Sequence, residues 1–220
     1  TEKRDSPHAR NLLVAAKSRP AWKLSPLRIP DRELKEWQDT HPLAQIQWTW
    51  DKSRATNRHY VNVVKALKWW RRVNHTTPKY PRSYPLEHLI GQCCPDGVGS
   101  VAEGVTRTLE EIRDRYAGHV SAGTKPCLQD HGVAQDVFRR VTPEEFAEFY
   151  GQVAEAADVA RGAYDSADTR ESAEGWRRLF GEKFPKPPDD GDGGKGGGRG
   201  PGGGYTRREE QGEIGGGRWG

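Results

Sequence analysis

The 220-residue sequence has no methionine, only three cysteines and no long apolar run. Because it lacks a start residue of its own, we expect the chain to be a fragment or a processed product. Cys93 and Cys94 are adjacent and Cys127 is distant, which does not make a disulfide framework and favours a reducing cytoplasm. No segment approaches the roughly 20 apolar residues of a membrane helix, so we expect a soluble, cytoplasmic protein without membrane contact.

Aliphatic side chains are nearly absent from residues 186–220, which hold most of the glycines. Such a segment cannot bury enough apolar surface to offset the entropy of ordering. We therefore predict a disordered Gly/Arg-rich tail over residues 186–220, a folded helical domain over residues 31–185, and an irregular remnant or divergent start over residues 1–30. The arginines of the tail are irregularly spaced, which favours a plain flexible tail over an RNA-contacting one.

Acidic residues are absent between Lys52 and Glu87, although the net charge of the whole chain is only +4. One-sided local charge of this kind usually faces an anion. The cations of this segment are Lys52, Arg54, Arg58, Lys65, Lys68, Arg71, Arg72, Lys79 and Arg82.

Apolar residues recur at helical spacing through most of the remaining chain, and no strand alternation competes with them. Capping patterns mark several helix starts, most clearly at Thr142 and Asp168. The fold is therefore predicted to be mainly α, a helical bundle. The predicted helices cover residues 31–37, 57–73, 83–90, 100–118, 142–164 and 168–181, with a further packing segment over residues 42–50.

The helix of Lys65 and Lys68 is followed by a helix whose cap is predicted at Ser83. A helix N-terminus offers free N–H groups and a partial positive charge to phosphate. If the two helices pack antiparallel, the lysines and the Ser83 hydroxyl converge on one anion, and Tyr84 offers a ring for base stacking. The alternative is a solvated basic face beside an ordinary helix cap.

Several ordered motifs resemble the bacterial CD-NTases, the oligonucleotide cyclases of anti-phage CBASS systems, which are related to cyclic GMP-AMP synthase and oligoadenylate synthase. The resemblance runs from about Ile29 to Pro185 and implies the C-terminal helical half of that fold. The motifs are VVKALKWWRR, PKYPRSYPLEHL, SVAEGVTRTLEEI, TPEEFAEFY and SAEGWRRLFGEKFP.

The resemblance also implies the roles of individual residues. Lys68 matches the lysine that contacts the donor triphosphate, Ser83 matches the serine that contacts the same phosphates, and Tyr84 matches the residue that stacks on a base. Lys65 lies on the same face and assists, whereas Arg72 is left as surface. Nucleoside triphosphates are the partners that these residues imply.

The sequence departs from the family where the chemistry occurs. The family needs a Gly-Ser turn, an Asp-x-Asp pair and a third Asp to hold two Mg²⁺ or Mn²⁺ ions, and no credible match to this set is present. We expect this chain to be inactive alone, as part of a synthase of cyclic or linear oligonucleotides. Its further expected partners are a missing N-terminal catalytic half or CBASS accessory proteins.

Three other interpretations remain open from sequence. A non-catalytic helical module could bind nucleic acid or a partner protein through the Lys52–Arg82 surface, and a degraded gene product would have no function. The side chains of His88, Cys93, Cys94 and Cys127 could form a zinc site, but adjacent cysteines are more often small buried hydrophobes.

Overall fold

The computed structural model describes residues 26–32, 35–74, 79 and 81–187. The chain divides after Pro187 into two units, and the first unit holds all of the described residues. Most of the predicted irregular start and nearly all of the predicted disordered tail lie outside the described residues.

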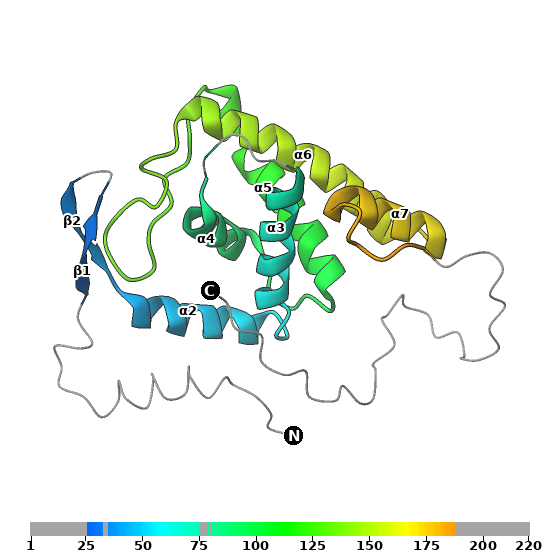
Figure 1. Cartoon of the computed structure of the whole chain (residues 1–220), viewed down its shortest axis with the longest axis horizontal. Helices are drawn as coiled ribbons and strands as arrows, with labels where there is room; N and C mark the ends of the chain where they lie inside the picture. Colours follow the sequence, from blue (N-terminus) through cyan, green and yellow to red (C-terminus); the bar gives the residue numbers. More distant parts are fainter. Residues whose placement is uncertain (1–25, 33–34, 75–78, 80, 188–220) are drawn as a thin grey trace, which may run out of the picture. The chain divides into compact units, whose positions relative to one another are not determined.

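Helices dominate the described residues, which confirms the predicted mainly α fold (Figure 1). None of the helices in this part of the chain combines the length and the apolar character needed to cross a bilayer. In chain order the elements are β1 (Leu27–Asp31), β2 (Glu36–Thr40), α2 (Pro42–Ala55), α3 (Tyr60–Asn74), α4 (Ser83–Cys93), α5 (Val101–Ser121), α6 (Pro143–Asp165) and α7 (Thr169–Phe180).

Side-chain caps begin the last two helices where the sequence predicts them. The Thr142 hydroxyl accepts from the Glu145 N–H at 3.2 Å, and the Glu145 carboxylate accepts from the Thr142 N–H at 3.1 Å, so α6 has a complete capping box. Asp168 caps α7 by accepting from two N–H groups of its first turn. Gly181, with φ of 81°, ends that helix.

The predicted start of α5 is confirmed, but its predicted end at Gly118 is wrong. Ser100 caps the helix by accepting from the Glu103 N–H at 3.0 Å. Gly118 stays helical, and α5 continues to Ser121. The left-handed backbone that terminates a helix is found further along, at Gly123 with φ of 65°.

The predicted helix over residues 31–37 is also wrong, because Asp31 ends β1, Glu36 and Trp37 begin β2, and the two strands pair antiparallel. Pro30 pairs with Trp37 across the two strands. The Asp31 carboxylate does not cap a helix, since it forms an ion pair with Arg140 from the segment before α6. Because Arg140 is distant from Asp31 in sequence, no local sequence pattern predicts this contact.

One face of α3 is buried in the core. Val63, Leu67 and Trp70, which form the predicted apolar stripe, are each at most 2% exposed. The Trp70 ring packs against Phe149 of α6, with the ring centroids 6.5 Å apart. Because α3 also contacts α4, α5 and α7, its position fixes which of its side chains remain at the surface.

The helices α5 and α6 pack antiparallel along each other. Near the start of α5 the Thr106 hydroxyl lies 3.4 Å from the carbonyl oxygen of Ala160, late in α6. Near the other end the Tyr116 ring meets the ring of Phe146, early in α6, edge to face at 6.0 Å.

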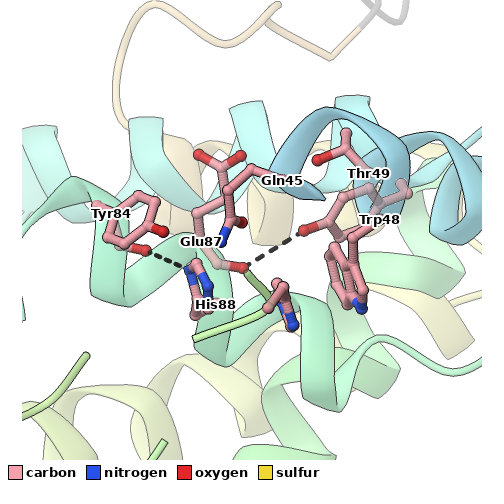
Figure 2. A pocket seen from close by; sticks show the side chains of 8 residues that line it. Gln45, Trp48, Thr49, Tyr84, Glu87 and His88 are labelled. Carbon is pink, nitrogen blue, oxygen red and sulfur yellow. Dashed lines mark hydrogen bonds between the residues drawn. The ribbon is translucent and has the colours of Figure 1, made fainter. Parts of the chain in front are cut away.

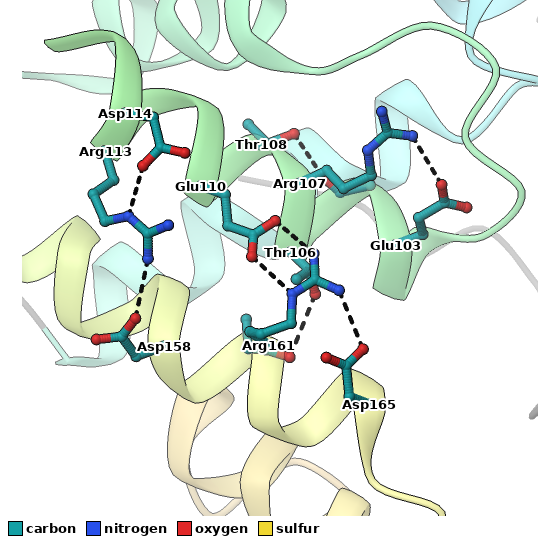
Figure 3. Close-up of polar contacts among 12 residues, drawn as sticks. Glu103, Thr106, Arg107, Thr108, Glu110, Arg113, Asp114, Asp158, Arg161 and Asp165 are labelled. Atoms are coloured by element: carbon teal, nitrogen blue, oxygen red, sulfur yellow. Dashed lines mark hydrogen bonds and ion pairs between the residues drawn. The ribbon is translucent and has the colours of Figure 1, made fainter.

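Ion pairs flank this contact (Figure 3). Arg161 of α6 donates to both carboxylate oxygens of Glu110 of α5, at 2.7 and 2.6 Å. Arg113 of α5 donates to Asp158 of α6 at 3.0 Å. These side chains are partly exposed, so each pair contributes about 1 kcal/mol or less and the packed interior is the larger stabilising term.

Gly104 of α5 provides a test of how closely α5 packs against α3. A Cβ at this position would lie 2.5 Å from Cγ2 of Val63 on α3, a stiff β-branched side chain. We expect Gly104→Ala to lower the free energy of unfolding by about 1–3 kcal/mol through overpacking, measured by urea unfolding.

Gly118→Ala on the same helix is the matched control. Apart from its chain neighbours and the backbone of its own helix, no atom of the described residues lies within 4 Å of a Cβ there, so alanine should raise the free energy of unfolding by about 0.5–1 kcal/mol. Equal stability of the Gly104→Ala and Gly118→Ala variants would contradict the close approach of α3 and α5.

Candidate functional site

The sequence-predicted site residues lie on α3 and at the start of α4. Lys68 Nζ lies 2.5 Å from Oε2 of Glu87, and these two side chains are 32% and 37% exposed. Glu87 follows Ser83 by about one helical turn, so the ion pair places Lys68 beside the first turns of α4. Lys65, three residues before Lys68, is exposed.

Ser83 does not cap α4, contrary to the prediction. The N-cap is Arg82, which keeps an extended backbone (φ −72°, ψ 177°) and makes no side-chain capping bond, while Ser83 is already helical and is exposed. The first turn of α4 carries no acidic side chain. No carboxylate within that turn therefore neutralises the positive end of the helix dipole.

Tyr84 follows Ser83 and is 43% exposed. Its ring lies against the ring of His88, with the centroids 4.5 Å apart and the planes tilted by 56°. Its hydroxyl donates to Oδ2 of Asp130 at 2.5 Å. The exposed ring surface is compatible with base stacking, which stays a prediction, whereas the hydroxyl contact was not foreseen.

Asp130 belongs to the segment between α5 and α6, and its side chain is only 3% exposed. Its Oδ1 accepts from Gln45 Nε2 at 2.9 Å and from the Gly132 N–H at 2.8 Å. Sequence reasoning missed this residue. The available signal was an Asp two residues before a Gly, which predicts a turn but gives no indication of what the carboxylate contacts.

A small pocket opens beside Tyr84 (Figure 2). Three aromatic rings are stacked along it, because His131 lies between Trp48, at 3.8 Å and 9°, and His88, at 4.3 Å and 12°. The Nε2 atoms of both histidines are buried and have no hydrogen-bond partner among the described residues. The remaining lining residues are Gln45, Thr49, Tyr60 and Glu87.

Burial controls the protonation of this cluster. It lowers the pKa of His88, and together with the neighbouring His88 it lowers the pKa of His131 to about 4. Burial by itself would raise the pKa of Asp130, but the hydrogen bonds from Tyr84 and Gly132 outweigh it and the pKa falls below its ordinary value. At neutral pH the cluster therefore holds two neutral imidazoles and one carboxylate.

The structure gives no support to the zinc site considered from sequence. Cys93 and Cys94 are buried in the core, whereas Cys127 is exposed. Burial raises the pKa of the Cys93 thiol to about 12, which disfavours the thiolate that a metal needs. Across residues 26–187, leaving out the few undescribed positions, no three His, Cys, Asp or Glu side chains are grouped to hold a metal ion.

Acid should destabilise this cluster. Both histidines have a lowered pKa in the folded chain, so between about pH 4 and 6.5 the unfolded chain binds more protons at His131. Above pH 6.5 the two histidines are neutral in both the folded and the unfolded chain, so they cause no loss of stability. As the pH falls toward 4, protonation of the unfolded chain lowers the free energy of unfolding. We expect the free energy of unfolding, measured with urea between pH 7 and pH 5, to fall by up to about 1.4 kcal/mol per pH unit for each histidine. In the His131→Gln variant the free energy of unfolding should depend less steeply on pH. An unchanged slope would contradict the lowered pKa of His131.

Comparison with known proteins identifies relatives. No protein-family model matches the chain. The chain is 51% identical over 174 residues to the cyclic AMP-AMP-GMP synthase of Enterobacter hormaechei subsp. hoffmannii, and 36% identical over 159 residues to the cyclic AMP-AMP-AMP synthase of an Acinetobacter strain. These matches cover 78% and 72% of this chain and 46% of each relative. The chain therefore spans just under half the length of these relatives.

Two solved structures share the fold. They are E. coli MS115-1 CdnC, determined with ATP, and the di-nucleotide cyclase DncV of Vibrio cholerae, determined in complex with GTP. The TM-scores are 0.56 and 0.53 at 17% and 14% identity, over 76% and 81% of this chain and 57% and 46% of those chains. Because half of the matched positions are identical to those of a cyclic AMP-AMP-GMP synthase and the helical fold agrees with that of CdnC and DncV, the chain resembles the CD-NTases over the part that it shares with them.

Proposed function

We propose that this chain contacts the triphosphate and the base of a nucleotide in a nucleotidyltransferase that makes cyclic or linear oligonucleotide second messengers for anti-phage defence. The observation that carries the proposal is the position of Lys68 beside the start of α4, where Ser83 and Tyr84 are both exposed. The relatives named above are synthases of cyclic oligonucleotides, which supports the same function here.

Phosphate recognition at this position combines three kinds of group. Lys68 provides a cation on a partly exposed side chain, and Ser83 provides an exposed hydroxyl. The first turn of α4 provides backbone N–H groups and the positive end of the helix dipole, without an acidic side chain to oppose an anion. All three act in the same direction on a triphosphate.

Glu87 holds Lys68 in the absence of nucleotide. The pair is partly exposed, so it is worth about 1 kcal/mol or less. A triphosphate carries more negative charge than one carboxylate and replaces Glu87 as the partner of the ammonium group at small cost. Glu87 thereby keeps Lys68 at the start of α4 until a phosphate arrives, and then competes with it.

Tyr84 provides the surface for the base. Stacking of a base on an aromatic side chain contributes about 1–3 kcal/mol and tolerates different bases. Lys65 is exposed on the surface of α3, so we assign it attraction over a distance, which salt screens, in place of a direct contact.

CD-NTases generally use divalent metal ions, and we propose Mg²⁺ or Mn²⁺ as the cofactor of the complete enzyme. The described residues do not fit the role of metal ligands, because they contain no suitable group of carboxylate, imidazole and thiol side chains. We therefore assign binding and orientation of the nucleotide to this part of the chain, and no step of bond formation.

Removal of the phosphate contacts tests the proposal. We expect Lys68→Ala to weaken the binding of Mg-ATP by about tenfold or more, and Ser83→Ala by about fivefold. The larger effect is expected at Lys68 because its ammonium group brings a charge to the phosphate, whereas the Ser83 hydroxyl is a neutral donor. Isothermal titration calorimetry on the purified chain measures both. The matched control is Arg72→Ala, an exposed cation on the same helix, which should leave ATP affinity unchanged.

Two outcomes would contradict the proposal. One is ATP binding that neither Lys68→Ala nor Ser83→Ala alters. The other is no saturable ATP binding together with binding of many nucleic-acid sequences that weakens steeply with salt, as a general basic surface would show.

Glu87 gives an independent prediction. Glu87→Gln keeps the size of the side chain but removes the charge that competes with phosphate, so we expect ATP to bind about twofold to fivefold more tightly. The same titration measures the change. Weaker binding would show that the carboxylate acts mainly by holding Lys68 in place.

A further inference from the structure

The contacts of Tyr84 point to one more residue of the nucleotide site. We propose that Asp130 is a positioning residue, which fixes the ring of Tyr84 in the orientation that a base stacks on. This inference rests on the proposed function, because it assigns a role within the same site.

Asp130 divides its hydrogen bonds between two tasks. Its Oδ1 accepts from Gln45 Nε2 at 2.9 Å and from the N–H groups of Gly132 and Val133 at 2.8 and 3.3 Å. Its Oδ2 accepts from the Tyr84 hydroxyl at 2.5 Å. One oxygen therefore fastens the carboxylate to its own turn and to α2, and the other holds Tyr84.

The turn that carries Asp130 packs closely against α2. A Cβ at Gly132 would lie 2.5 Å from Cβ of His41 and 3.0 Å from Cβ of Ala44, so the turn approaches the start of α2 as closely as a glycine allows. The neighbouring His131 is stacked on Trp48 of the same helix at 3.8 Å. The carboxylate is presented from a packed position, which a positioning residue requires.

Tyr84 needs such an anchor because much of its side chain faces solvent. It is 43% exposed, and its ring meets the ring of His88 in a tilted contact, with the centroids 4.5 Å apart. An exposed ring without a fixed hydroxyl samples several rotamers, and a stacking base must then select one of them. The bond to Asp130 removes that cost before the nucleotide arrives.

His88 does not take over the carboxylate. Its Nε2 is 4.0 Å from Oδ2 of Asp130, beyond hydrogen-bond distance, and its Nδ1 lies 3.3 Å from the carbonyl oxygen of Tyr84. Oδ2 is therefore available to the Tyr84 hydroxyl.

A purely structural role for Asp130, closing the turn before Gly132, makes different predictions from a positioning role. A structural defect lowers stability and weakens all ligands of the site together. A positioning defect acts through the Tyr84 hydroxyl and affects only ligands that carry a base. The two roles separate when ATP is compared with inorganic tripolyphosphate, which has phosphates but no base.

The experiment is a double-mutant cycle of Asp130→Asn and Tyr84→Phe in the full 220-residue chain, with calorimetric titration of Mg-ATP and of tripolyphosphate. We expect each single variant to weaken ATP by about fivefold, in the range of couplings between contacting residues. Affinity for tripolyphosphate should not change. In the Tyr84→Phe background, Asp130→Asn should weaken ATP no further.

The matched control is Asp136→Asn in the same segment. Asp136 accepts from the N–H groups of Leu128 and Phe138 and pairs with Lys125, and none of these contacts involves Tyr84. This variant should lower the melting temperature without changing the ratio of the two affinities. Circular dichroism and thermal unfolding check that each variant is folded.

Each result has one meaning. Loss of ATP and tripolyphosphate binding together, or equal losses with and without the Tyr84 hydroxyl, would overturn the positioning role alone. If the wild-type chain binds no ATP, the proposed function fails and this role fails with it. If Asp130→Asn does not fold, Tyr84→Phe decides, because it removes the same hydrogen bond from the exposed side, and unchanged ATP affinity would overturn the role.

Discussion

The burial of one face of α3 is the constraint on which the rest of this structure depends. Val63, Leu67 and Trp70 enter the core, and α4, α5 and α7 pack around the same helix. A helix with one face fixed in this way cannot rotate, so the opposite face is fixed as well. The position of Lys68 next to the start of α4 is a consequence of hydrophobic packing, and the electrostatics of the site are built on it.

Two carboxylates organise the surface that this packing creates. Glu87 holds the ammonium group of Lys68, and Asp130 holds the hydroxyl of Tyr84. The first contact is partly exposed and therefore weak, while the second is anchored by a nearly buried side chain. This difference in burial suits the roles proposed for the two side chains, in which the cation changes partners and the ring stays in one orientation.

Local patterns predicted much of the helical fold. The capping box of Thr142 and the cap of Asp168 were visible in sequence, because each capping residue bonds to residues no more than three positions further along the chain. The hairpin of β1 and β2 was not, since Asp31 is held by Arg140, more than a hundred positions away. Within the candidate site, Lys68 and Tyr84 were named from sequence, but Asp130 and His131 were not, because a turn pattern does not tell which helix the turn approaches.

The sequence by itself determined that the chain is mainly helical, that its cations gather before Glu87, and that its motifs resemble the CD-NTases. These features depend on composition, spacing and short-range hydrogen bonds, which are written along the chain. Only the tertiary structure decided that Lys68 is paired with Glu87 and that Asp130 reaches Tyr84. Such contacts depend on how helices pack in three dimensions, and the side chains that meet there are separated by loops whose course no local rule specifies.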